Sequence, residues 1–509
     1  MATKTFKFLY SFNKKKIMII LGLNIFHGDS SACIVKDGLV LSAVEEERFT
    51  RKKHWAGFPK NSINFCLKEN NFTLKDVDHI CVNQNNYSNI FKKLLYVGLN
   101  RINLEYVFNK IKKRKLRNLQ NLFEKNFAKN GFKGKYHNVE HHLAHTSSAY
   151  YLSPFTESVN VSIDGFGDFV STAWGTGNKF KNSIENKIYF PHSLGIFYQS
   201  LTQFLGFLNY GDEYKVMGLA PYGKNYLKNE FDKILDSDSS GKFKLNLEYF
   251  RHQKNNIEFK WDDGMPIFDQ IYDDKIESLL GKKRDKNSNL EKKHFDIAFS
   301  TQKKYEEVFF NLLEKIYQKT PSENLTISGG CAMNSVANGK IKERTKFKNI
   351  FTLSSPGDAG GAIGSALYVH TKLMGNKPQL NNSPYLGPSF TNDYIEKAIE
   401  LKIEKRNDFE IKKMNTNEMI KYVANKVSEG NVVGWFQGKM EFGPRALGNR
   451  SILCDPRNSD MQATLNIKIK RRESFRPFAP SILLDKVEEW FEKPSIVPYM
   501  SEVLDIKKD

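Results

Sequence analysis

The chain has 509 residues, with 77 lysines and arginines against 57 aspartates and glutamates, and a formal net charge of +20. This length allows two or three domains with substantial cores, and no apolar run approaches the length of a membrane span, so we expect no membrane partner. The lysines are spread along the chain without a recognition helix, a zinc finger or an aromatic-basic platform. The charge alone therefore does not predict a nucleic-acid partner.

The five cysteines are scattered and show no Cys-x-x-Cys spacing. This pattern predicts reduced thiols in a cytoplasmic protein and argues against a zinc ribbon. Near the start, lysines precede the apolar run Ile17 to Leu21, but no small-residue cleavage site follows it. We therefore expect a first strand here rather than a signal peptide, with Met1 or Met18 as the natural start.

The chain opens with a strand and a hairpin. Strands are predicted at Ile19 to Leu23, Ala32 to Val35 and Leu39 to Val44, and the last two are joined by an Asp-Gly turn, which is a strong hairpin signal. The same layout recurs between Val159 and Phe190, where a strand enters a turn at Asp164 and two more strands follow. Such a unit used twice is typical of a duplicated ribonuclease-H-like fold, as in actin and hexokinase; two unrelated hairpins are the alternative.

The segment between these units, Asn86 to Phe132, is rich in lysine and has leucines and phenylalanines at helical spacing. We expect helices that pack on the core, with a membrane-surface or partner helix as the alternative.

Two histidines and an aspartate follow. His141 and His145 stand at i and i+4 in a predicted helix from His142 to Tyr151, so both can face one ion. Asp164 closes an alternating strand and enters a Gly-rich turn, where a carboxylate is free to project. Two imidazoles and a carboxylate suit a divalent iron, zinc or manganese ion. The alternative is that His141 only starts the helix and His145 is a core histidine.

Three further segments carry candidate residues. In the Gly-rich loop from Gly211 to Gly223, Lys215 is the expected anion contact, with an ordinary surface loop as the alternative. A helix from Asp296 to Lys319 and a strand from Leu325 to Ile327 lead to a Gly-Gly turn, which could approach a phosphate closely. Asp358 follows the strand Asn349 to Thr352, and we expect it to be a further metal carboxylate or, alternatively, a helix N-cap.

The last part of the chain is separated by the proline-rich stretch Gly375 to Pro388, which predicts a domain boundary. A helix (Thr416 to Glu429) and a strand (Val432 to Phe436) precede a group of cations set among Gly, Pro and Phe: Arg445, Arg450, Lys470, Arg472 and Arg476. Arginines in such rigid surroundings favour bidentate binding of phosphate or carboxylate. Ion pairs with Glu441 and Glu473 are the alternative for some of them.

Together these residues resemble the NodU/CmcH family of O-carbamoyltransferases. The matching stretches are His27 to Ser31, Glu45 to Pro59, His141 to His145, Asp164 to Asp168, Glu213 to Gly223, Ser328 to Asn334, Pro356 to Gly361, Glu441 to Leu453 and Phe475 to Pro480. They follow the family's order over nearly the whole chain. The resemblance implies an α/β protein with an actin-like, threonylcarbamoyl-transferase-like domain at 18–374, a linker at 375–408 and a YrdC-like domain at 409–509.

The resemblance also implies a reaction. The YrdC-like domain would join carbamoyl phosphate to ATP, with magnesium expected as its counterion, and form carbamoyl-adenylate with release of pyrophosphate. The other domain would pass the carbamoyl group to a hydroxyl of a small acceptor such as a sugar or a natural product. Cations neutralise phosphate charge as pyrophosphate leaves, and a Lewis acid polarises the carbamoyl carbonyl or the hydroxyl.

Carried over by position, the resemblance assigns the residues as follows. His141, His145, Asp164 and Asp358 would hold the metal, with iron expected and zinc or manganese as alternatives. Gly329, Gly330 and Asn334 would contact the nucleotide. The phosphate site would include Lys439, Arg445, Arg450, Lys470, Arg472 and Arg476. His27 is the expected acid-base or acceptor contact, with a structural histidine as the alternative.

One departure stands out. Family members continue beyond the Phe-Arg-Pro-Phe-Ala-Pro segment into a further motif with another arginine, whereas this sequence stops at Asp509. The YrdC-like half therefore looks incomplete, which keeps a truncated pseudoenzyme or one half of a split enzyme open. A tRNA threonylcarbamoylation enzyme is a weaker alternative. The sequence names neither the acceptor nor the oligomeric state, and a homodimer or a completing partner chain both fit it.

Overall fold

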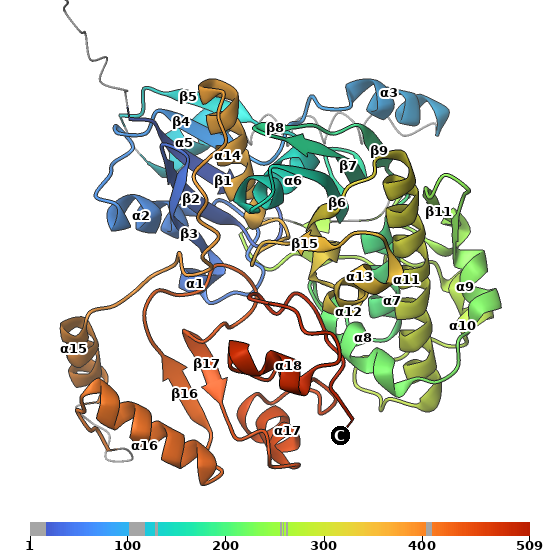
Figure 1. The fold of residues 1–509 in the computed structure, drawn as a ribbon. Coiled ribbons are helices and arrows are strands. Elements are labelled where there is room, and N and C mark those ends of the chain that lie inside the picture. Colours follow the sequence, from blue (N-terminus) through green and yellow to red (C-terminus); the bar gives the residue numbers. More distant parts are fainter. Residues whose placement is uncertain are drawn as a thin grey trace, which may run out of the picture.

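A computed structural model describes residues 17–100, 118–127, 131–254, 257, 259–260, 263–403 and 410–508. It is a mixed α/β protein with two central sheets, which lie side by side in the upper half of Figure 1, and a C-terminal part below them.

The first sheet has five strands in the order β3-β2-β1-β4-β5. β1 (Ile19–Asn24), β2 (Ser31–Lys36) and β3 (Leu39–Glu45) pair antiparallel, while β4 (His79–Val82) and β5 (Lys135–Asn138) continue parallel to β1. The predicted strands and hairpin are confirmed. All six residues of β1 are buried, which explains why its sequence is continuously apolar rather than alternating.

The second sheet repeats this arrangement. β6 (Glu157–Gly167), β7 (Val170–Asn178) and β9 (Asn186–Tyr189) pair antiparallel, and β14 (Asn324–Ser328) and β15 (Asn349–Phe351) continue parallel to β6. A two-residue strand, β8 (Lys181–Asn182), also pairs with β7. In both sheets, three antiparallel strands are thus followed by two parallel ones.

Two helices fill the space between the sheets. α6 (His141–Leu152) packs on β6 and β14, α14 (Gly360–Met374) packs on β1, β2 and β4, and the two helices pack on each other. Gly364 allows this close crossing, because a Cβ there would collide with the carbonyl oxygen of Ala144. The two helices carry or adjoin the candidate metal ligands, so their packing sets the geometry of that site.

A second core lies beside the second sheet. It is built around α7 (Leu194–Phe204), α8 (Glu213–Leu219), α9 (Lys228–Ile234) and the long α11 (Lys292–Lys319), with Phe197, Phe231 and Phe309 buried. The predicted helix from Asp296 begins four residues earlier, because Glu291 and His294 form a capping box at Lys292.

The other elements are short. They are α1 (Glu47–Thr50), α2 (Lys60–Glu69), α5 (Leu119–Asn126), β10 (Leu235–Ser237), β11 (Phe243–Leu245), β12 (Phe259–Lys260), β13 (Ile267–Phe268), α10 (Glu277–Leu280), α12 (Ser335–Gly339) and α13 (Ile341–Arg344).

The C-terminal part contains α15 (Asn392–Ile403), α16 (Thr416–Ser428), α17 (Met461–Thr464), α18 (Val487–Trp490) and an antiparallel pair, β16 (Val433–Phe436) with β17 (Arg450–Leu453). The expected helix and strand before the cations are confirmed. The proline-rich stretch runs beside β3, where Leu386 accepts a hydrogen bond from the backbone of Ala43.

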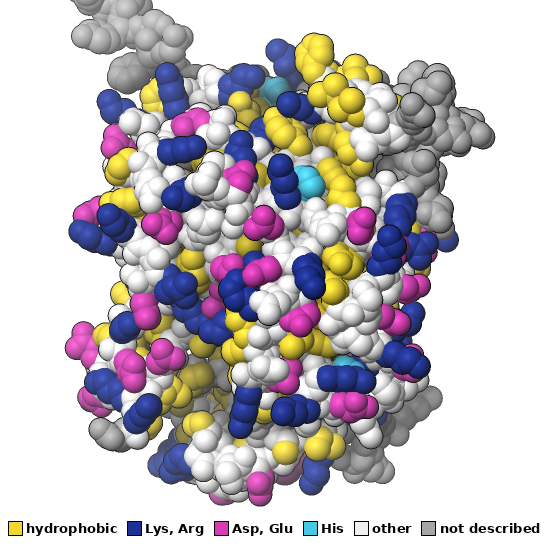
Figure 2. All heavy atoms as spheres, turned by 90° about the vertical axis from the view of Figure 1, so that its right-hand side faces the viewer, with side chains coloured by type: hydrophobic (Ala, Val, Ile, Leu, Met, Phe, Trp, Pro, Cys, Tyr) yellow, Lys and Arg dark blue, Asp and Glu magenta, His cyan; other side chains and the backbone are white. Residues whose placement is uncertain are grey.

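The expectation of core-packed helices between Asn86 and Phe132 is only half right. α5 buries Leu119, Leu122 and Phe123. α3 (Ile90–Leu99) buries none of its residues, and Phe91 and Leu99 are 84% and 74% exposed. Hydrophobic side chains gather at the top of the face in Figure 2, where Figure 1 places α3. Residues 101–117 and 128–130 lie outside the described part.

Among the described residues, we find no helix whose length and apolar character would let it cross a membrane.

Candidate functional site

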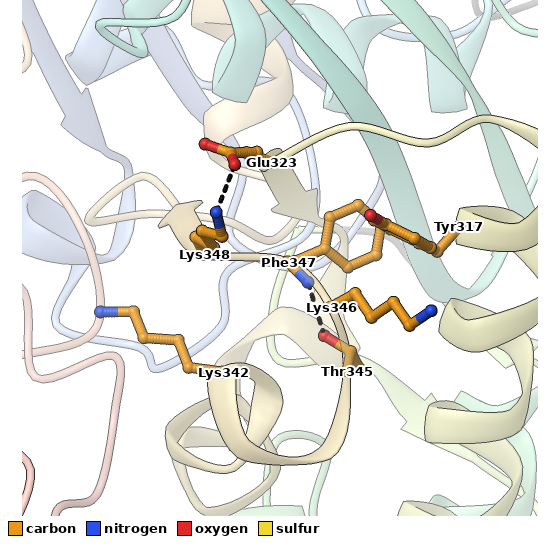
Figure 3. A pocket seen from close by; sticks show the side chains of 7 residues that line it. All are labelled: Tyr317, Glu323, Lys342, Thr345, Lys346, Phe347 and Lys348. Carbon is orange, nitrogen blue, oxygen red and sulfur yellow. Dashed lines mark hydrogen bonds and ion pairs between the residues drawn. The ribbon is translucent and has the colours of Figure 1, made fainter.

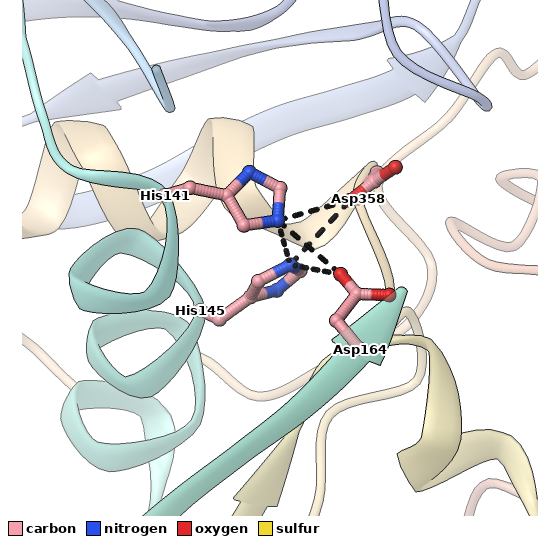
Figure 4. Close-up of side chains that lie close together, drawn as sticks. All are labelled: His141, His145, Asp164 and Asp358. Carbon is pink, nitrogen blue, oxygen red and sulfur yellow. Dashed lines mark hydrogen bonds and ion pairs between the residues drawn. The ribbon is translucent and has the colours of Figure 1, made fainter. Parts of the chain in front are cut away.

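Four side chains converge from three distant segments (Figure 4). Nε2 of His141 and Nε2 of His145 lie 3.0 Å apart, and Oδ2 of Asp164 lies 3.2 and 3.1 Å from them. Oδ1 of Asp358 lies 3.5 Å from both nitrogens. We call these four residues the histidine–aspartate cluster; their ligand atoms all lie within 4.8 Å of one another.

Local sequence explains how the histidines are placed. Glu140 caps α6 by accepting a hydrogen bond from the backbone of Leu143, so the helix begins at His141 and its i, i+4 spacing brings both imidazoles to one face. Gly167 leaves room for the first ring, because a Cβ at this position would collide with His141.

The two carboxylates arrive from the ends of other elements. Asp164 lies near the end of β6, and Asp358 stands just before α14. The N-cap of α14 is Ala359, and no side chain caps it, so the alternative that Asp358 is the N-cap is wrong. Oδ1 of Asp164 accepts hydrogen bonds from the backbone of Gly165 and Gly330, which leaves Oδ2 turned toward the histidines.

The spacing of these atoms fits a shared metal ion. Donors that bind one ion at about 2.0–2.2 Å are about 3 to 3.5 Å from one another. Both imidazoles are buried, and the buried Oδ1 of Asp358 has no hydrogen-bond partner within the described residues. Two imidazoles and two carboxylates form a donor set that suits a borderline divalent ion. The identity of the ion does not follow from this geometry.

The electrostatics of the cluster also favour a cation. Burial opposes a charge on His145, but its hydrogen bond to Asp164 and the nearby carboxylate of Asp358 outweigh it and raise the pKa of this imidazole to about 9. Burial and the charge of Asp164 oppose ionisation of Asp358, yet His145 and His27 lower its pKa to about 2. Burial is likewise outweighed at Asp164, whose pKa lies well below its usual range because both cluster histidines donate to it. Both carboxylates are therefore ionised at neutral pH.

The raised pKa of His145 predicts how metal binding depends on pH. A histidine must be neutral to be a ligand, so below about pH 9 the ion competes with the proton on His145. We expect the apparent affinity for Zn²⁺ to rise about tenfold per pH unit from neutral pH toward pH 9 and then to level off. Competition with a chromogenic chelator measures this. An affinity that does not change with pH would contradict the assignment of His145 as a ligand.

His142, which lies between the two cluster histidines, is structural. Nδ1 lies 2.8 Å from Oγ of Ser162, and Nε2 lies 2.9 Å from the carbonyl oxygen of Val170. Burial lowers the pKa of this imidazole to about 4, so it stays neutral.

His27 lies beside the cluster. Its ring stacks on His141 with 5.1 Å between centroids, and its Nδ1 is 3.8 Å from Oδ2 of Asp358. It is therefore placed to contact a substrate bound at the cluster.

The Gly-Gly turn, whose two glycines are expected to contact the nucleotide, lies against Asp164 of the histidine–aspartate cluster. Gly329 has φ +86, and a Cβ there would collide with the carbonyl oxygen of Ile163. The N–H of Gly330 donates to Asp164, so this turn supports a cluster carboxylate. Asn334 caps α12 and exchanges hydrogen bonds with Gln302, so its amide is already engaged.

A second group of side chains, which we call the cationic cluster, lies at the start of α8. It contains Lys53, Arg445, Lys470, Arg472 and Arg476. The guanidinium of Arg476 lies over the ring of Tyr214, 4.3 Å from its centroid. Burial lowers the pKa of Arg445, and the charge of Arg476 lowers it further; burial, Arg472, Lys53 and Arg476 lower that of Lys470.

The charges of this cluster are incompletely neutralised. Arg476 lies 3.4 Å from Glu473, and Arg472 donates to Asn466. The side chains of Arg445 and Lys470 have no hydrogen bond or ion pair within the described part of the chain. Like charges held together without enough carboxylates form a site that an anion would stabilise.

Three of the expected phosphate contacts are already engaged by other groups. Lys215 is bound by Asp212 at 3.0 Å and Glu473 at 2.9 Å, which neutralise its charge. Lys439 is 3.3 Å from Glu69 and 42% exposed. Arg450 donates to the carbonyl oxygens of Gln437, Asn449, Pro388 and Gly438, so it ties the loop together. Glu69 and Glu473 are distant in sequence from the lysines that they bind, and the pattern of cations alone could not reveal them.

Glu45 and Arg48 form a clamp that sequence reasoning assigned no role. Oε1 of Glu45 accepts a hydrogen bond from the N–H of Gly443 at 2.6 Å, and Nη2 of Arg48 donates to the carbonyl of the same residue at 2.7 Å. Gly443 has φ +130 and lies against Ser354, so no side chain fits there. The clamp fixes the backbone two residues before Arg445. One indication of this role was present in the sequence: the stretch from Glu45 to Pro59 matches the family, but none of its residues had an assigned function.

The buried carboxylate of Glu441 binds the backbone of the same loop. Its Oε1 accepts hydrogen bonds from the N–H groups of Leu447 and Asn449 at 2.7 and 2.9 Å. The alternative that Glu441 neutralises the arginines is therefore wrong, because its carboxylate binds backbone groups.

A pocket of about 610 Å³ lies apart from both clusters (Figure 3). It is lined by Tyr317, Glu323, Lys342, Thr345, Lys346, Phe347 and Lys348. Lys348 pairs with Glu323, Lys346 lies over the ring of Tyr317, and Lys342 donates to Ser495. Its cations already have partners, so it offers no comparable chemistry.

Comparisons with known proteins match this chain along most of its length. The model described as Carbamoyltransferase N-terminus matches residues 19–367, and that described as Carbamoyltransferase C-terminus matches residues 424–509. The uncharacterized protein sll1178 of Synechocystis is 39% identical over 96% of this chain and 80% of its own length. The nodulation protein NolNO of Sinorhizobium fredii is 33% identical over 95% of this chain and 67% of its own.

A shorter match is to the 3'-hydroxymethylcephem-O-carbamoyltransferase of Amycolatopsis lactamdurans. It is 31% identical over 38% of this chain and 35% of its own length. Among solved structures, HypF of T. kodakarensis aligns with 70% of this chain and 48% of its own, at 14% identity. Its TM-score of 0.31 is too low to support an argument.

Proposed function

Because this chain belongs to the carbamoyltransferase family, we propose that it is an O-carbamoyltransferase that uses ATP and carbamoyl phosphate to carbamoylate a hydroxyl of a small acceptor. The observation that carries the proposal is the proximity of two chemically different clusters. The first turn of α8 connects them: Glu213 interacts electrostatically with Asp164, and the next residue, Tyr214, lies under Arg476.

The first step would form carbamoyl-adenylate at the cationic cluster. A water molecule takes the phosphoryl group of carbamoyl phosphate, which leaves carbamate and inorganic phosphate. A carbamate oxygen then bonds to the α-phosphorus of ATP, and the bond from that phosphorus to pyrophosphate breaks with its electron pair on the departing pyrophosphate. Both reactants are polyanions, and Arg445, Lys470 and Arg476 supply charge where the pyrophosphate departs. The absence of a described acidic partner for Arg445 supports this role.

The second step would take place at the histidine–aspartate cluster. A divalent ion held there, for which we propose iron with zinc or manganese as alternatives, would supply a Lewis acid to the carbamoyl carbonyl or the acceptor hydroxyl. His27, which stacks on His141, is placed to accept the hydroxyl proton. Gly330 keeps Asp164 turned toward the histidines during this step.

The fold supports the same proposal. The repeated order of the two sheets is what a duplicated ribonuclease-H-like domain requires, and we propose that this domain covers 18–374. We assign 375–408 to a linker and 409–509 to a YrdC-like domain. All five cysteines are free thiols, which supports a cytoplasmic location. The name of the cephem enzyme, 3'-hydroxymethylcephem-O-carbamoyltransferase, contains a hydroxymethyl group, which supports an alcohol as acceptor.

Pyrophosphate release tests the proposal. Purified, metal-loaded protein is mixed with ATP and carbamoyl phosphate, and each is omitted in turn. We expect release that requires both, together with inorganic phosphate. An acceptor screen would then follow AMP formation and carbamate esters. No release from folded, metal-loaded protein would overturn the proposal of an autonomous carbamoyltransferase.

The clamp at Gly443 provides a further prediction. Glu45→Gln keeps the shape of the side chain but removes the charge that holds Arg48. Because a small displacement of Arg445 misplaces its charge, we expect pyrophosphate release to fall about 10²-fold, mainly in kcat. The exposed Glu157→Gln is the control and should behave like wild type. Unchanged release in Glu45→Gln would show that the clamp does not position Arg445.

A further inference from the structure

A second histidine–carboxylate pair lies in the loop that follows α1. Nδ1 of His54 is 2.8 Å from Oδ1 of Asp29, and the backbone N–H of His54 donates to Oε2 of Glu47 at 2.7 Å. The other ring nitrogen, Nε2, has no hydrogen-bond partner within the described residues, and the side chain is 24% exposed. The imidazole is thus firmly oriented and still accessible.

The surrounding backbone is shaped around this ring. Asp29 and His54 have φ values of 56 and 52, a left-handed conformation that such residues rarely adopt and that is concentrated at functional sites. A Cβ at Gly211 would collide with Nε2 of His54, so only glycine leaves room for the ring. The ring of Tyr210 meets it edge-on, with 5.3 Å between centroids.

His54 lies at the junction of the two clusters. Asp29 belongs to the same turn as His27, which stacks on His141. On the other side, Lys53 is close enough to Lys470 to lower its pKa. The carbamoyl-adenylate would form at the cationic cluster and react with its carbonyl at the histidine–aspartate cluster. Its phosphoryl group must then lie between the two clusters, near this junction.

The charge of the ring suits a phosphoryl group. Burial opposes protonation of His54, but Asp29, Glu47 and Glu213 outweigh it and raise its pKa to about 9. Glu213 itself has its pKa raised to about 7 by burial, so it contributes less than a full negative charge at neutral pH. Tyr210 also meets the ring edge-on, and Arg48 pairs with Glu47 at 3.1 Å. At neutral pH the free Nε2 therefore carries a proton.

We propose that His54, held by Asp29, is a further substrate-contacting residue that donates a hydrogen bond from Nε2 to the phosphoryl group of the adenylate during carbamoyl transfer. This inference rests on the proposed function. In that step the acceptor oxygen bonds to the carbamoyl carbon and its proton passes to His27. The bond from that carbon to the phosphate oxygen breaks, and its electron pair remains on AMP, where His54 stabilises the added charge.

Binding of AMP and adenosine tests the proposal without knowledge of the acceptor. Calorimetry would compare wild type, His54→Gln and, as the control, Lys52→Gln, which removes an exposed charge from the same loop. We expect His54→Gln to weaken the affinity for AMP at least about tenfold, because one charge-assisted hydrogen bond to the phosphate is lost. The affinity for adenosine, which has no phosphate, should change less than about twofold. Lys52→Gln should change AMP binding less than about twofold.

The pH dependence gives a second signature. Affinity of wild type for AMP should fall as the pH rises through about 9, where His54 loses its proton, and His54→Gln should lack this fall. Asp29→Asn should move the fall to lower pH, because the neighbouring negative charge is gone; asparagine tolerates the left-handed backbone at this position. This variant decides the question if His54→Gln does not fold.

The outcomes separate the two proposals. No binding of AMP or adenosine by folded wild type would count against the proposed function itself. If wild type binds AMP but His54→Gln binds it equally well, or loses AMP and adenosine equally, the assignment of His54 is overturned and the proposed function stands.

Discussion

Replacing Asp358 with asparagine will remove the metal ion from the histidine–aspartate cluster and stop carbamoyl transfer, while pyrophosphate release continues. The substitution keeps the size of the side chain and removes the charge whose Oδ1 lies 3.5 Å from both histidine nitrogens. Loss of a residue that only hydrogen-bonds to a metal ligand already lowers metal affinity about 10–10²-fold, so loss of a direct ligand should lower it more.

Metal content after dialysis, measured by mass spectrometry, checks this prediction, together with separate assays of the two steps. Asp76→Asn, an exposed carboxylate that bonds only within its own turn, is the matched control and should keep the metal. A full complement of tightly bound metal in Asp358→Asn would show that Asp358 is not a ligand. A parallel loss of pyrophosphate release would show that the two clusters do not divide the reaction as we propose.

Replacing Arg445 with alanine will reduce pyrophosphate release and leave the metal ion bound. We expect pyrophosphate release to fall by about 10²–10³-fold, because a charge that faces the leaving group in the transition state is lost. Metal content should not change, since the histidine–aspartate cluster is untouched.

Thermal stability distinguishes this effect from simple unfolding. Arg445 has no described partner and lies beside Arg476, whose charge lowers its pKa, so removing it relieves repulsion and should leave the melting temperature unchanged or higher. The control is Arg457→Ala, an exposed arginine paired with Asp455 in the same part of the chain. Pyrophosphate release at the wild-type rate in Arg445→Ala would place the phosphate site elsewhere.

Much of the fold could be predicted because its signals are local. Each strand of the first hairpin is a short apolar run, and the Asp37-Gly38 turn between them has the positive φ at both residues that a tight hairpin uses. The i, i+4 spacing of His141 and His145 is likewise a property of one helix, although the sequence did not reveal that Glu140 caps it. These predictions needed no knowledge of distant residues.

Exposure was harder to predict. α3 and α5 have similar helical patterns of apolar residues, yet α5 buries Leu119, Leu122 and Phe123, whereas α3 buries none of its residues and touches the body of the protein mainly through Tyr96. A periodic pattern predicts that a helix has an apolar face, but the pattern does not contain the surface that would cover it.

The candidate site shows the same division. The cluster histidines and Asp164 were predicted from spacing and a turn, whereas the N-cap alternative for Asp358 could only be decided by where α14 begins. Among the cations, Arg450 and Arg445 stand in one loop and look alike in sequence. One donates to four carbonyl oxygens, and the other has no described partner.

The sequence by itself thus determined the strands of the two hairpins, several helices, the family and the identity of the groups that could bind a metal or a phosphate, because these depend on residue type and short spacing. The tertiary structure alone decided which cations remain unneutralised, that Glu45 and Arg48 clamp a glycine almost four hundred positions away, and that His54 pairs with Asp29. The physical reason is that a charge acts on whatever lies within a few ångströms of it, and folding brings together residues that no local pattern connects.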